Sequence, residues 1–411
     1  MNVSAKRLGA FLIALCMIAP SFSYAATKTT TKKVTMKRPA PLEIGGWVPY
    51  WRMATGTADV LSHVDQLTSV MPFGYTMKQD GAIYDAMNYA SSTSLQALIA
   101  VAKSDKVRVV PTIMWSNGDA IHATLSSAKK RRALEDNIVA LVKQNNFDGI
   151  DIDFEGKKAE TKPYFSLFLK GLSQRLGSKK WLYCAVEART PVADRYSGTP
   201  PADATQYAND YAAIGKYCDR VEIMAYDQGT IDVNLNAAAD GTPYIPVADT
   251  AWVKKVVALT AKSIPKNKIV IGVATYGYEY EVTKLSEYGF RYDLQWALNP
   301  KYATDLASSL NIVPTRNAAG ELSFTYTPTT TNSTAPLPAG VNVADVAMAS
   351  TSYSDGATTT APNAAPVNIV WWSDASAIKD KIDLARSLGV RGVSIFKLDG
   401  GEDPNIWNIL K

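Results

Sequence analysis

The sequence predicts an α/β fold, a (β/α)8 (TIM) barrel with a small α+β insertion between the seventh and eighth strands. Two observations lead there. Short runs rich in Val, Ile and aromatic residues alternate eight times with longer stretches of helical spacing, the pattern of repeated β-α units. The alternative, a doubly wound open sheet, needs a Gly-rich phosphate loop after an early strand, and none is present.

The eight expected strands are short and rich in β-branched or aromatic residues. They cover residues 45–51, 70–75, 107–115, 147–155, 181–186, 221–227, 268–276 and 391–398. The stretches between them have apolar residues three or four positions apart, as in an amphipathic helix. These expected helices cover residues 94–104, 125–145, 164–176, 207–217, 252–263 and 375–388.

About ninety residues between the last two strands do not follow the repeat, and we place an insertion at about 277–367. Residues 276–316 are rich in aromatic side chains, and residues 321–327 and 367–372 resemble strands. Residues 328–366 are rich in Thr, Ala, Ser and Pro, which predicts an irregular or mobile loop.

The N-terminal region differs from the body. Lys6 and Arg7 precede an apolar run over 8–18, and Ser23-Tyr24-Ala25 is a small-x-small site, so residues 1–25 are predicted to be a signal peptide. Residues 26–41 form a basic linker, and 42–411 the barrel. No later segment has 18 uninterrupted apolar residues, so we expect no membrane span and a secreted, periplasmic or cell-envelope location.

The charge balance argues against a nucleic-acid partner. The 411-residue chain has a net charge of +5, but seven basic and no acidic residues precede position 39. The remainder has 36 basic and 38 acidic residues and is nearly neutral. We expect a monomer.

The stretch Asp148 to Glu155 carries the strongest chemical signal. Ile150, Ile152 and Phe154 alternate with the acids Asp151, Asp153 and Glu155, so a strand would place three carboxyls on one face, successive ones about 7 Å apart. A solvated surface strand is the alternative. It fits poorly because helices are predicted on both sides, and strands of parallel sheets are usually covered on both faces.

A barrel strand ending at Glu155 places this residue at the mouth, with Asp153 and Asp151 progressively deeper. Two charges about 6 Å apart repel by roughly 3 kcal/mol at an effective dielectric near 20. We therefore expect the group to retain a proton at neutral pH. We place it chiefly on Glu155 and have Asp151 and Asp153 share a proton as a coupled pair.

The pattern Asp-x-x-Asp-x-Asp-x-Glu at Asp148, Asp151, Asp153 and Glu155 resembles the signature of glycoside hydrolase family 18, the chitinase-like enzymes. Segments 370–374 and 397–403 look most like its bacterial spore-cortex and peptidoglycan N-acetylglucosaminidase branch. The resemblance implies a retaining hydrolase of β-1,4-linked N-acetylglucosamine polysaccharides that uses no cofactor. In such enzymes the substrate's own acetamido group replaces the usual carboxylate nucleophile.

The resemblance also assigns roles. Glu155 would be the acid and base, Asp153 would orient the acetamido group, and Asp151 would tune Asp153. Met224-Ala225-Tyr226-Asp227 resembles the family's Met-x-Tyr-Asp, in which the Tyr binds the acetamido carbonyl and the Asp binds the sugar. Asp148, Met224 and Asp227 are therefore predicted to belong to the substrate-binding group, and Asp148 to support its strand.

Aromatic residues near predicted strand ends complete the predicted site, because sugar faces stack on aromatic rings, although any one ring is more often part of a core. The predicted substrate-binding aromatics are Tyr50, Phe73, Trp115, Tyr276 and Phe396. Phe396 stands where the family usually has a Trp.

The sequence is compatible with two other functions. One is a carbohydrate-binding protein of the same fold with weak or no catalysis; the presence of Glu155 argues against it. The other is a metal enzyme using the three acids, but consecutive positions on one strand make a poor cage, and neither His63 nor His122 has a metal-ligand spacing. The sequence leaves open whether Cys184 and Cys218 form a disulfide.

Overall fold

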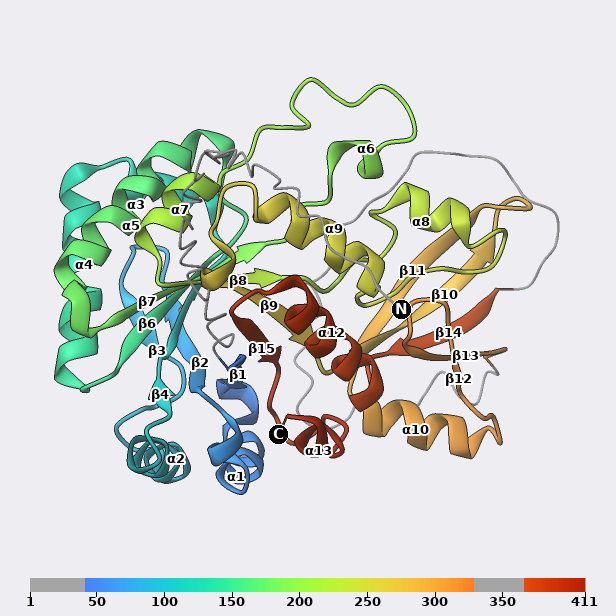
Figure 1. Cartoon of the computed structure of the whole chain (residues 1–411), viewed down its shortest axis with the longest axis horizontal. Helices are drawn as coiled ribbons and strands as arrows, with labels where there is room; N and C mark the ends of the chain where they lie inside the picture. Colours follow the sequence, from blue (N-terminus) through green and yellow to red (C-terminus); the bar gives the residue numbers. More distant parts are fainter. Residues whose placement is uncertain (1–40, 329–365, 411) are drawn as a thin grey trace, which may run out of the picture. The chain divides into compact units, whose positions relative to one another are not determined.

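The computed structural model describes residues 41–328 and 366–410 (Figure 1). The predicted signal peptide, nearly all of the linker and most of the 328–366 loop lie outside these residues. Within the described residues no helix is both long and apolar enough to cross a membrane.

Eight parallel strands form a closed barrel, which confirms the predicted fold class. The strands are β1 (Glu43–Pro49), β2 (Ser69–Met77), β5 (Thr112–Trp115), β6 (Gly149–Phe154), β7 (Trp181–Glu187), β8 (Arg220–Met224), β9 (Ile269–Ala274) and β15 (Gly392–Phe396). The barrel closes because β1 pairs in parallel with both β2 and β15. Gly46, for example, lies opposite Val70 on one side and Ile395 on the other.

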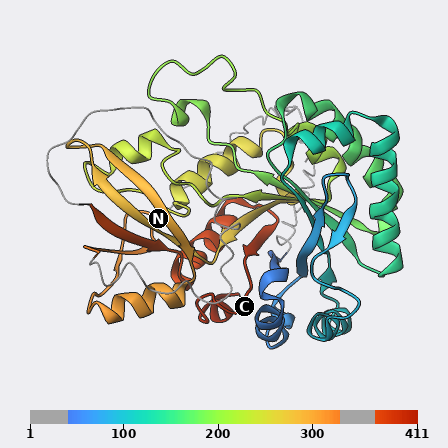
Figure 2. The ribbon, with the colours of Figure 1, turned by 180° about the vertical axis from the view of Figure 1, so that it is seen from behind.

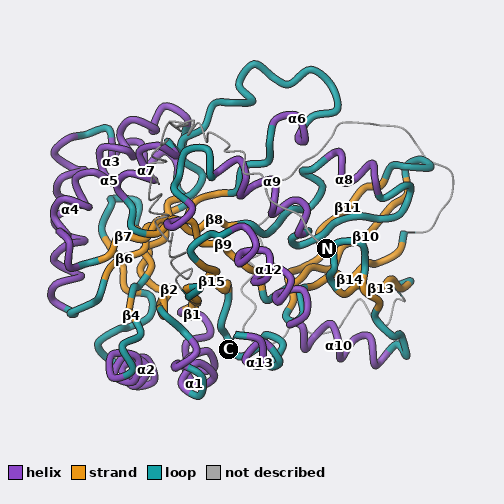
Figure 3. The backbone as a smooth tube through the Cα atoms, viewed as in Figure 1, coloured by secondary structure: helices purple, strands orange, loops and turns teal. Residues whose placement is uncertain are grey.

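Helices cover the outside of the barrel, as Figures 1 and 3 show. The described α-helices are α1 (Met53–Leu61), α2 (Thr93–Ser104), α3 (Gly118–Leu125), α4 (Ala128–Gln144), α5 (Lys162–Leu176), α6 (Val192–Arg195), α7 (Tyr211–Tyr217), α8 (Val233–Ala238), α9 (Thr250–Thr260), α10 (Pro300–Ser309), α12 (Ala375–Leu388) and α13 (Ile406–Ile409). Short 3-10 turns cover Tyr50–Arg52, Val64–Gln66, Ala159–Thr161, Gly177–Lys179 and Lys266–Lys268.

Two predicted elements have different bounds in the structure, each for a local reason. The expected strand 107–115 is split into β4 (Arg108–Val109) and β5, with Pro111 between them, a residue that has no N–H to donate to a strand partner. The expected helix at 125–145 starts at Ala128, because Ser127 accepts a hydrogen bond from the Lys130 amide and caps it.

The two faces of β6 have opposite chemistry. Its apolar residues point outward to the helices: Phe154 stacks on Phe168 of α5, with ring centres 5.5 Å apart, and Ile150 and Ile152 are fully buried in the same core. The alternate residues, Asp151 and Asp153, therefore point into the barrel.

The N-terminal end of the barrel is closed by an ion cluster around Glu43. Arg220 donates two hydrogen bonds to its carboxylate at 2.5 and 2.8 Å, and Arg391 and Arg108 donate at 2.7 and 3.3 Å. Burial alone would raise the pKa of Glu43, but Arg220 and Arg391 outweigh it and lower the pKa to about 2. This carboxylate therefore stays ionised.

The insertion is a five-stranded antiparallel sheet, drawn orange to red in Figures 1 and 2. Its strands are β10 (Gly277–Lys284), β11 (Phe290–Leu298), β12 (Thr315–Arg316), β13 (Leu322–Tyr326) and β14 (Val367–Trp372), in the order β11-β10-β14-β13-β12. The sheet thus includes all of β14 and ends at Trp372. A three-residue strand, β3 (Ile83–Asp85), pairs with the end of β2.

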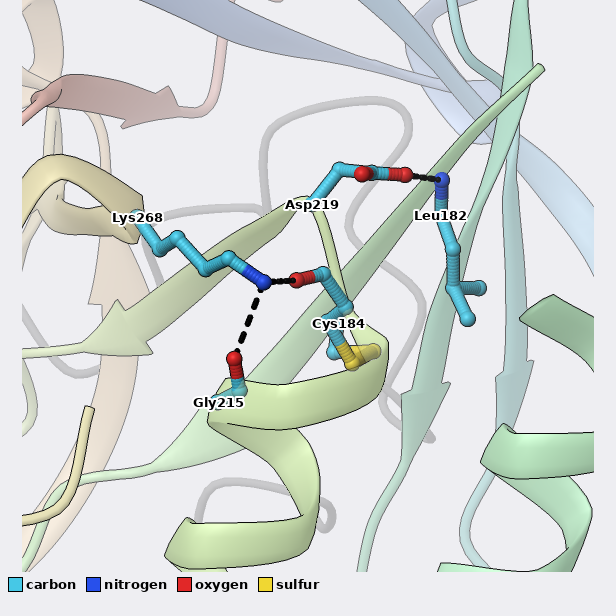
Figure 4. Close-up of a disulfide and its surroundings, with 6 residues drawn as sticks. Leu182, Cys184, Gly215, Asp219 and Lys268 are labelled. Atoms are coloured by element: carbon cyan, nitrogen blue, oxygen red, sulfur yellow. Dashed lines mark hydrogen bonds between the residues drawn. A yellow bond between two sulfur atoms is a disulfide. The ribbon is translucent and has the colours of Figure 1, made fainter. Parts of the chain in front are cut away.

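Cys184 of β7 and Cys218 at the end of α7 form a disulfide, with Cα atoms 6.2 Å apart (Figure 4). Lys268 reinforces this corner by donating hydrogen bonds to the carbonyls of Gly215 and Cys218 at 2.9 and 2.8 Å. The question that the sequence left open is thus resolved in favour of a bridge.

Glu321 connects the insertion to the barrel. Its carboxylate is completely buried and accepts hydrogen bonds from a barrel loop, from the inserted sheet and its exit, and from α12. The donors are the Val247 and Ala248 amides (both 2.9 Å), Trp371 Nε1 (2.7 Å), Ser373 Oγ (3.0 Å) and Lys381 Nζ (3.3 Å).

Replacing Glu321 with Ala should lower the free energy of unfolding by about 3 to 5 kcal/mol, because the buried Lys381 ammonium and two amides lose their acceptor. Denaturant titration followed by circular dichroism measures this change. Glu287→Ala, at an exposed position in the turn between β10 and β11 of the inserted sheet, is the control and should change little. If the two variants had equal denaturation midpoints, Glu321 would not be connecting the insertion to the barrel.

Candidate active site

Asp151, Asp153 and Glu155 form a ladder inside the barrel that rises toward its C-terminal mouth. Asp151 is 0% exposed, Asp153 is 4% exposed, and Glu155, directly after β6, is half-buried. The Glu155 backbone amide donates to the Trp115 carbonyl at 2.8 Å, which fixes the start of the loop carrying the acid. The structure brings these three predicted residues together as expected.

The ladder holds protons at neutral pH. Burial and the negative charge of Glu187 raise the pKa of Glu155 to about 7, although Lys157 opposes the shift. Burial, with the charges of Glu155 and Asp151, raises the pKa of Asp153 well above its ordinary range. A hydrogen bond with Asp153 lowers the pKa of Glu155, so Asp153 is the donor. Both pKa values are raised, so the retained proton belongs to the coupled Asp153–Glu155 pair, whereas the sequence-based prediction placed it chiefly on Glu155.

A second buried pair lies beneath, between Asp151 and Glu222 of β8. Trp47 Nε1 and Thr112 Oγ1 both donate to Asp151 Oδ2, at 3.1 and 2.8 Å. Ser394 Oγ donates to Glu222 Oε1 at 2.5 Å.

These hydroxyl and indole donors leave one oxygen of each carboxyl without such a partner, namely Asp151 Oδ1 and Glu222 Oε2. The two side chains share a hydrogen bond that raises the pKa of Glu222 and lowers that of Asp151, so Glu222 is the donor. Burial still raises the pKa of Asp151 to about 6.

Tyr226 and Asp227 follow β8 and face the ladder. Tyr226 is 9% exposed, and the charges of Asp153 and Glu155 contribute, after burial and Asp227, to a raised pKa of its hydroxyl. Asp227 has a positive φ of 56° and accepts hydrogen bonds from the hydroxyls of Tyr276 and Tyr278 at 2.7 and 2.6 Å.

Asp227 is exposed to solvent, yet desolvation by the surrounding protein raises its pKa.

Phe396 lies at the centre of an aromatic floor. Its ring stacks on Tyr226 at 5.8 Å with an interplanar angle of 15°. It also makes edge contacts with three other rings at 5.8 to 6.2 Å: Trp47, Phe73 and Tyr276. Met224, the last residue of β8, is half-buried and faces the same interior. The predicted residues Phe73, Met224, Tyr276 and Phe396 are thus brought to the mouth.

Three predicted substrate-binding residues lie elsewhere or are peripheral. Asp148 precedes β6 at the opposite, N-terminal end of the barrel, and its carboxylate accepts the Val109 amide at 2.8 Å, so it supports the strands and its predicted binding role is wrong. Trp115 points outward, is 2% exposed and packs on Phe154, so it belongs to the core. Tyr50 is half-buried at the end of β1, against Trp51.

Sequence reasoning missed several residues of this interior. Glu222 was part of a predicted strand, and an acid between Val221 and Ile223 gives the same period-2 signal as the ladder. Trp47, Thr112 and Ser394 carry no such signal, because their role depends on which strands become neighbours. Among the described residues no group of three or more His, Cys, Asp or Glu is arranged to hold a metal ion.

The C-terminal mouth is where the active sites of (β/α)8 barrels lie, and neighbouring carboxyls of raised pKa are suited to general acid–base chemistry, including that at glycosidic bonds. The model of the family described as Glycosyl hydrolases family 18 matches residues 44–401, and the chain belongs to this family. The resemblance seen in the sequence is confirmed.

Similar curated proteins include two from Bacillus subtilis. The chain is 25% identical over 321 residues to the uncharacterized glycosylase YvbX of Bacillus subtilis, covering 76% of this chain and 77% of the relative. It is 26% identical over 289 residues to the cortical fragment-lytic enzyme of Bacillus subtilis, covering 70% of this chain but only 54% of the relative.

Among solved structures, a chitinase from Chromobacterium violaceum has a TM-score of 0.65 at 20% identity, covering 90% of this chain and 98% of that one. The spore cortex-lytic enzyme SleL of Bacillus cereus also has a TM-score of 0.65, at 19% identity, with 90% and 73% covered. At these identities the structural matches establish the fold.

The Asp151–Glu222 pair predicts a specific pH dependence of stability. A carboxyl whose pKa rises on folding contributes stability that is fully present below its unfolded pKa, near 4, and lost as pH rises through the folded value. The free energy of unfolding should therefore fall between about pH 4.5 and 7.5. In Glu222→Gln this fall should be smaller by about 2 kcal/mol, because the amide donates to Asp151 without a titrating proton.

Urea titrations at the two pH values measure this difference. Glu160→Gln, at an exposed position, should keep the wild-type pH dependence. An unchanged fall in Glu222→Gln would show that the pair does not share a proton.

Proposed function

We propose that this protein is a retaining glycoside hydrolase that cleaves β-1,4-linked N-acetylglucosamine polysaccharides. One observation supports this most strongly: at the mouth of the barrel the Asp153–Glu155 carboxyl pair holds a proton next to Tyr226, above the Phe396 floor. A carboxyl with a pKa near 7 can donate a proton to a glycosidic oxygen at neutral pH and take one back.

In the proposed mechanism Glu155 donates its proton to the leaving glycosidic oxygen. The sugar's acetamido oxygen attacks the anomeric carbon, closing an oxazolinium ring as the bond to the leaving oxygen breaks. Asp153, ionised once its proton has passed toward Glu155, accepts the acetamido N–H and balances the positive ring. The Tyr226 hydroxyl, kept neutral by its raised pKa, donates to the acetamido oxygen. Glu155 then removes a proton from the incoming water, whose oxygen bonds to the anomeric carbon as the bond from the acetamido oxygen breaks.

The Asp151–Glu222 pair, which lies below the mouth inside the barrel, would assist this cycle. Asp151 lies between Asp153 and the neutral Glu222, so a proton can relocate within the ladder without leaving the barrel. The Asp227 carboxylate, held by two tyrosine hydroxyls in a solvent-accessible position, is placed to accept a sugar hydroxyl.

The relatives define the candidate polymers. They include chitinases and cortical fragment-lytic enzymes, and the Ostrinia furnacalis Group II chitinase catalytic domain 2, with a TM-score of 0.62 and 15% identity, was solved with a chain of five N-acetylglucosamine units. We therefore propose chitin and peptidoglycan as the candidate substrates of this protein.

We also propose that the protein is exported. The N-terminal pattern over residues 1–25 is that of a cleaved leader. The Cys184–Cys218 disulfide supports an oxidising location, because structural disulfides persist mainly outside the cytosol.

Glu155→Gln should lower kcat on chitooligosaccharides or peptidoglycan fragments at least about 100-fold while the fold is retained, because general acid–base catalysis contributes that much or more. The wild-type kcat/KM should fall as pH rises above about 7, where Glu155 loses its proton. Product analysis by mass spectrometry and a pH–rate profile measure both.

Glu160→Gln, an exposed Glu-to-Gln change five residues along the chain, is the matched control and should keep wild-type kcat. Full activity of Glu155→Gln would overturn the mechanism. Binding of these glycans without turnover in the wild type would instead favour a carbohydrate-binding protein of the same fold.

A further inference from the structure

A pocket of about 250 Å³ lies immediately beside Glu155. It is bounded by the residues that follow the acid, by the segment after β7 and by the loop that leads to α7. The lining includes Lys157, Glu187, Arg189, Arg195, Tyr207 and Asn209. Because Gly156 alone separates Glu155 from Lys157, a group held here is adjacent to the bond that Glu155 is proposed to protonate.

Among the lining residues, Lys157 gives the strongest indication of what the pocket binds. Its side chain is 1% exposed, and its ammonium has no hydrogen-bond partner among the described residues. The nearest carboxylate oxygen, on Glu187, is 3.8 Å away, and the face of the Phe165 ring lies 4.7 Å away. A buried ammonium with one long ion pair is costly, and a further anion in the pocket would satisfy it.

Two arginines add positive charge on the other walls. Arg189 is held between the rings of Tyr207 and Tyr211, at 3.9 and 3.7 Å, and donates to the Asn209 carbonyl. Arg195 lies against the Tyr196 ring at 4.9 Å. No ion pair joins either arginine to a carboxylate of the described chain at 4.0 Å or less. Stacking fixes the guanidinium planes without neutralising them.

Glu187 is the one acid among the lining residues, so three cations face one carboxylate. The Glu187 carboxylate already has partners within the protein: Asn209 Nδ2 donates to its Oε2 at 2.5 Å, and the Lys157 ammonium lies near its Oε1. The charge balance of the pocket is therefore positive. Chitin, a neutral polymer, offers nothing that requires this balance.

We propose that this pocket binds a carboxylate carried by the sugar or substituent next to the scissile bond, and that the enzyme therefore acts on acidic N-acetylglucosamine glycans of the peptidoglycan type in preference to chitin. The inference rests on the proposed hydrolase function. The lactyl ether or the stem peptide of peptidoglycan supplies such a carboxylate, and guanidinium and ammonium groups bind carboxylates through charge-assisted hydrogen bonds.

The test uses one peptidoglycan-derived oligosaccharide in two forms, with its carboxylates free and with the same carboxylates converted to amides. At low salt the wild type should show a kcat/KM about ten-fold or more higher for the acid form, and the ratio should shrink at 0.5 M salt. Arg195→Gln should move the ratio toward one. Arg132→Gln, an exposed arginine of α4, is the matched control and should keep the wild-type ratio.

A second readout does not depend on turnover. In Glu155→Gln, calorimetry should show tighter binding of the acid form than of the amide form, and adding Arg195→Gln should remove the difference. Equal kcat/KM for the two forms in the wild type would contradict the proposal that the pocket binds a carboxylate, while leaving the proposed hydrolase function unaffected. Failure to hydrolyse either form and chitooligosaccharides as well would overturn the proposed function itself.

Discussion

The closed barrel forces carboxyl groups to share protons. Inward-facing positions of a small barrel are filled by side chains and exclude water, so an acid placed there must find a cation, a donor or a proton. Asp151 and Glu222 accept hydrogen bonds from neighbouring side chains, and the carboxyls of Asp151, Asp153 and Glu222 interact with other carboxyls of the interior. Glu155, at the top of this ladder, inherits a pKa near 7 from the same constraint. The chemistry of the mouth therefore depends on the packing beneath it.

The two ends of the barrel give opposite solutions to that constraint. At the N-terminal end Glu43 is surrounded by three arginines and has a pKa of about 2. At the C-terminal end Glu155 meets acids and has a raised pKa. The same residue type is thus held ionised at one end and has a pKa near neutrality at the other, which is the C-terminal face where the active sites of barrel enzymes lie.

The sequence predicted the fold and the ladder well because both depend on local periodicity. Alternation of Ile and Phe with acids over 150–155 defines the two faces of β6 without reference to any other strand. The binding residues were less predictable. Asp148 shares the motif with Glu155 but lies at the other end of the strand. Trp115 packs outward with Ile113, while Thr112 and Met114 face the barrel interior, and a strand with apolar residues on both faces does not indicate from its own pattern which face is inward.

What the sequence could not supply is the pairing of distant residues. Glu222 meets Asp151 from a strand about seventy positions away, and Glu321 binds groups from three separate segments. The disulfide is of the same kind: two cysteines at neighbouring strands left the question open until the approach of α7 to β7 brought them within bonding distance. Such contacts follow from the order of strands around the barrel, which no single segment encodes.

Glu187 links the acid to the pocket beside it. Its charge raises the pKa of Glu155, and the same carboxylate pairs at long range with Lys157, whose charge lowers that pKa. The protonation of the acid and the charge of the pocket are therefore coupled rather than separate properties of this mouth. A carboxylate entering the pocket would neutralise part of the positive field that opposes protonation of Glu155, which acts in the direction that a general acid requires. The charge of the pocket and the pKa of Glu155 thus depend on the same side chains, Glu187 and Lys157.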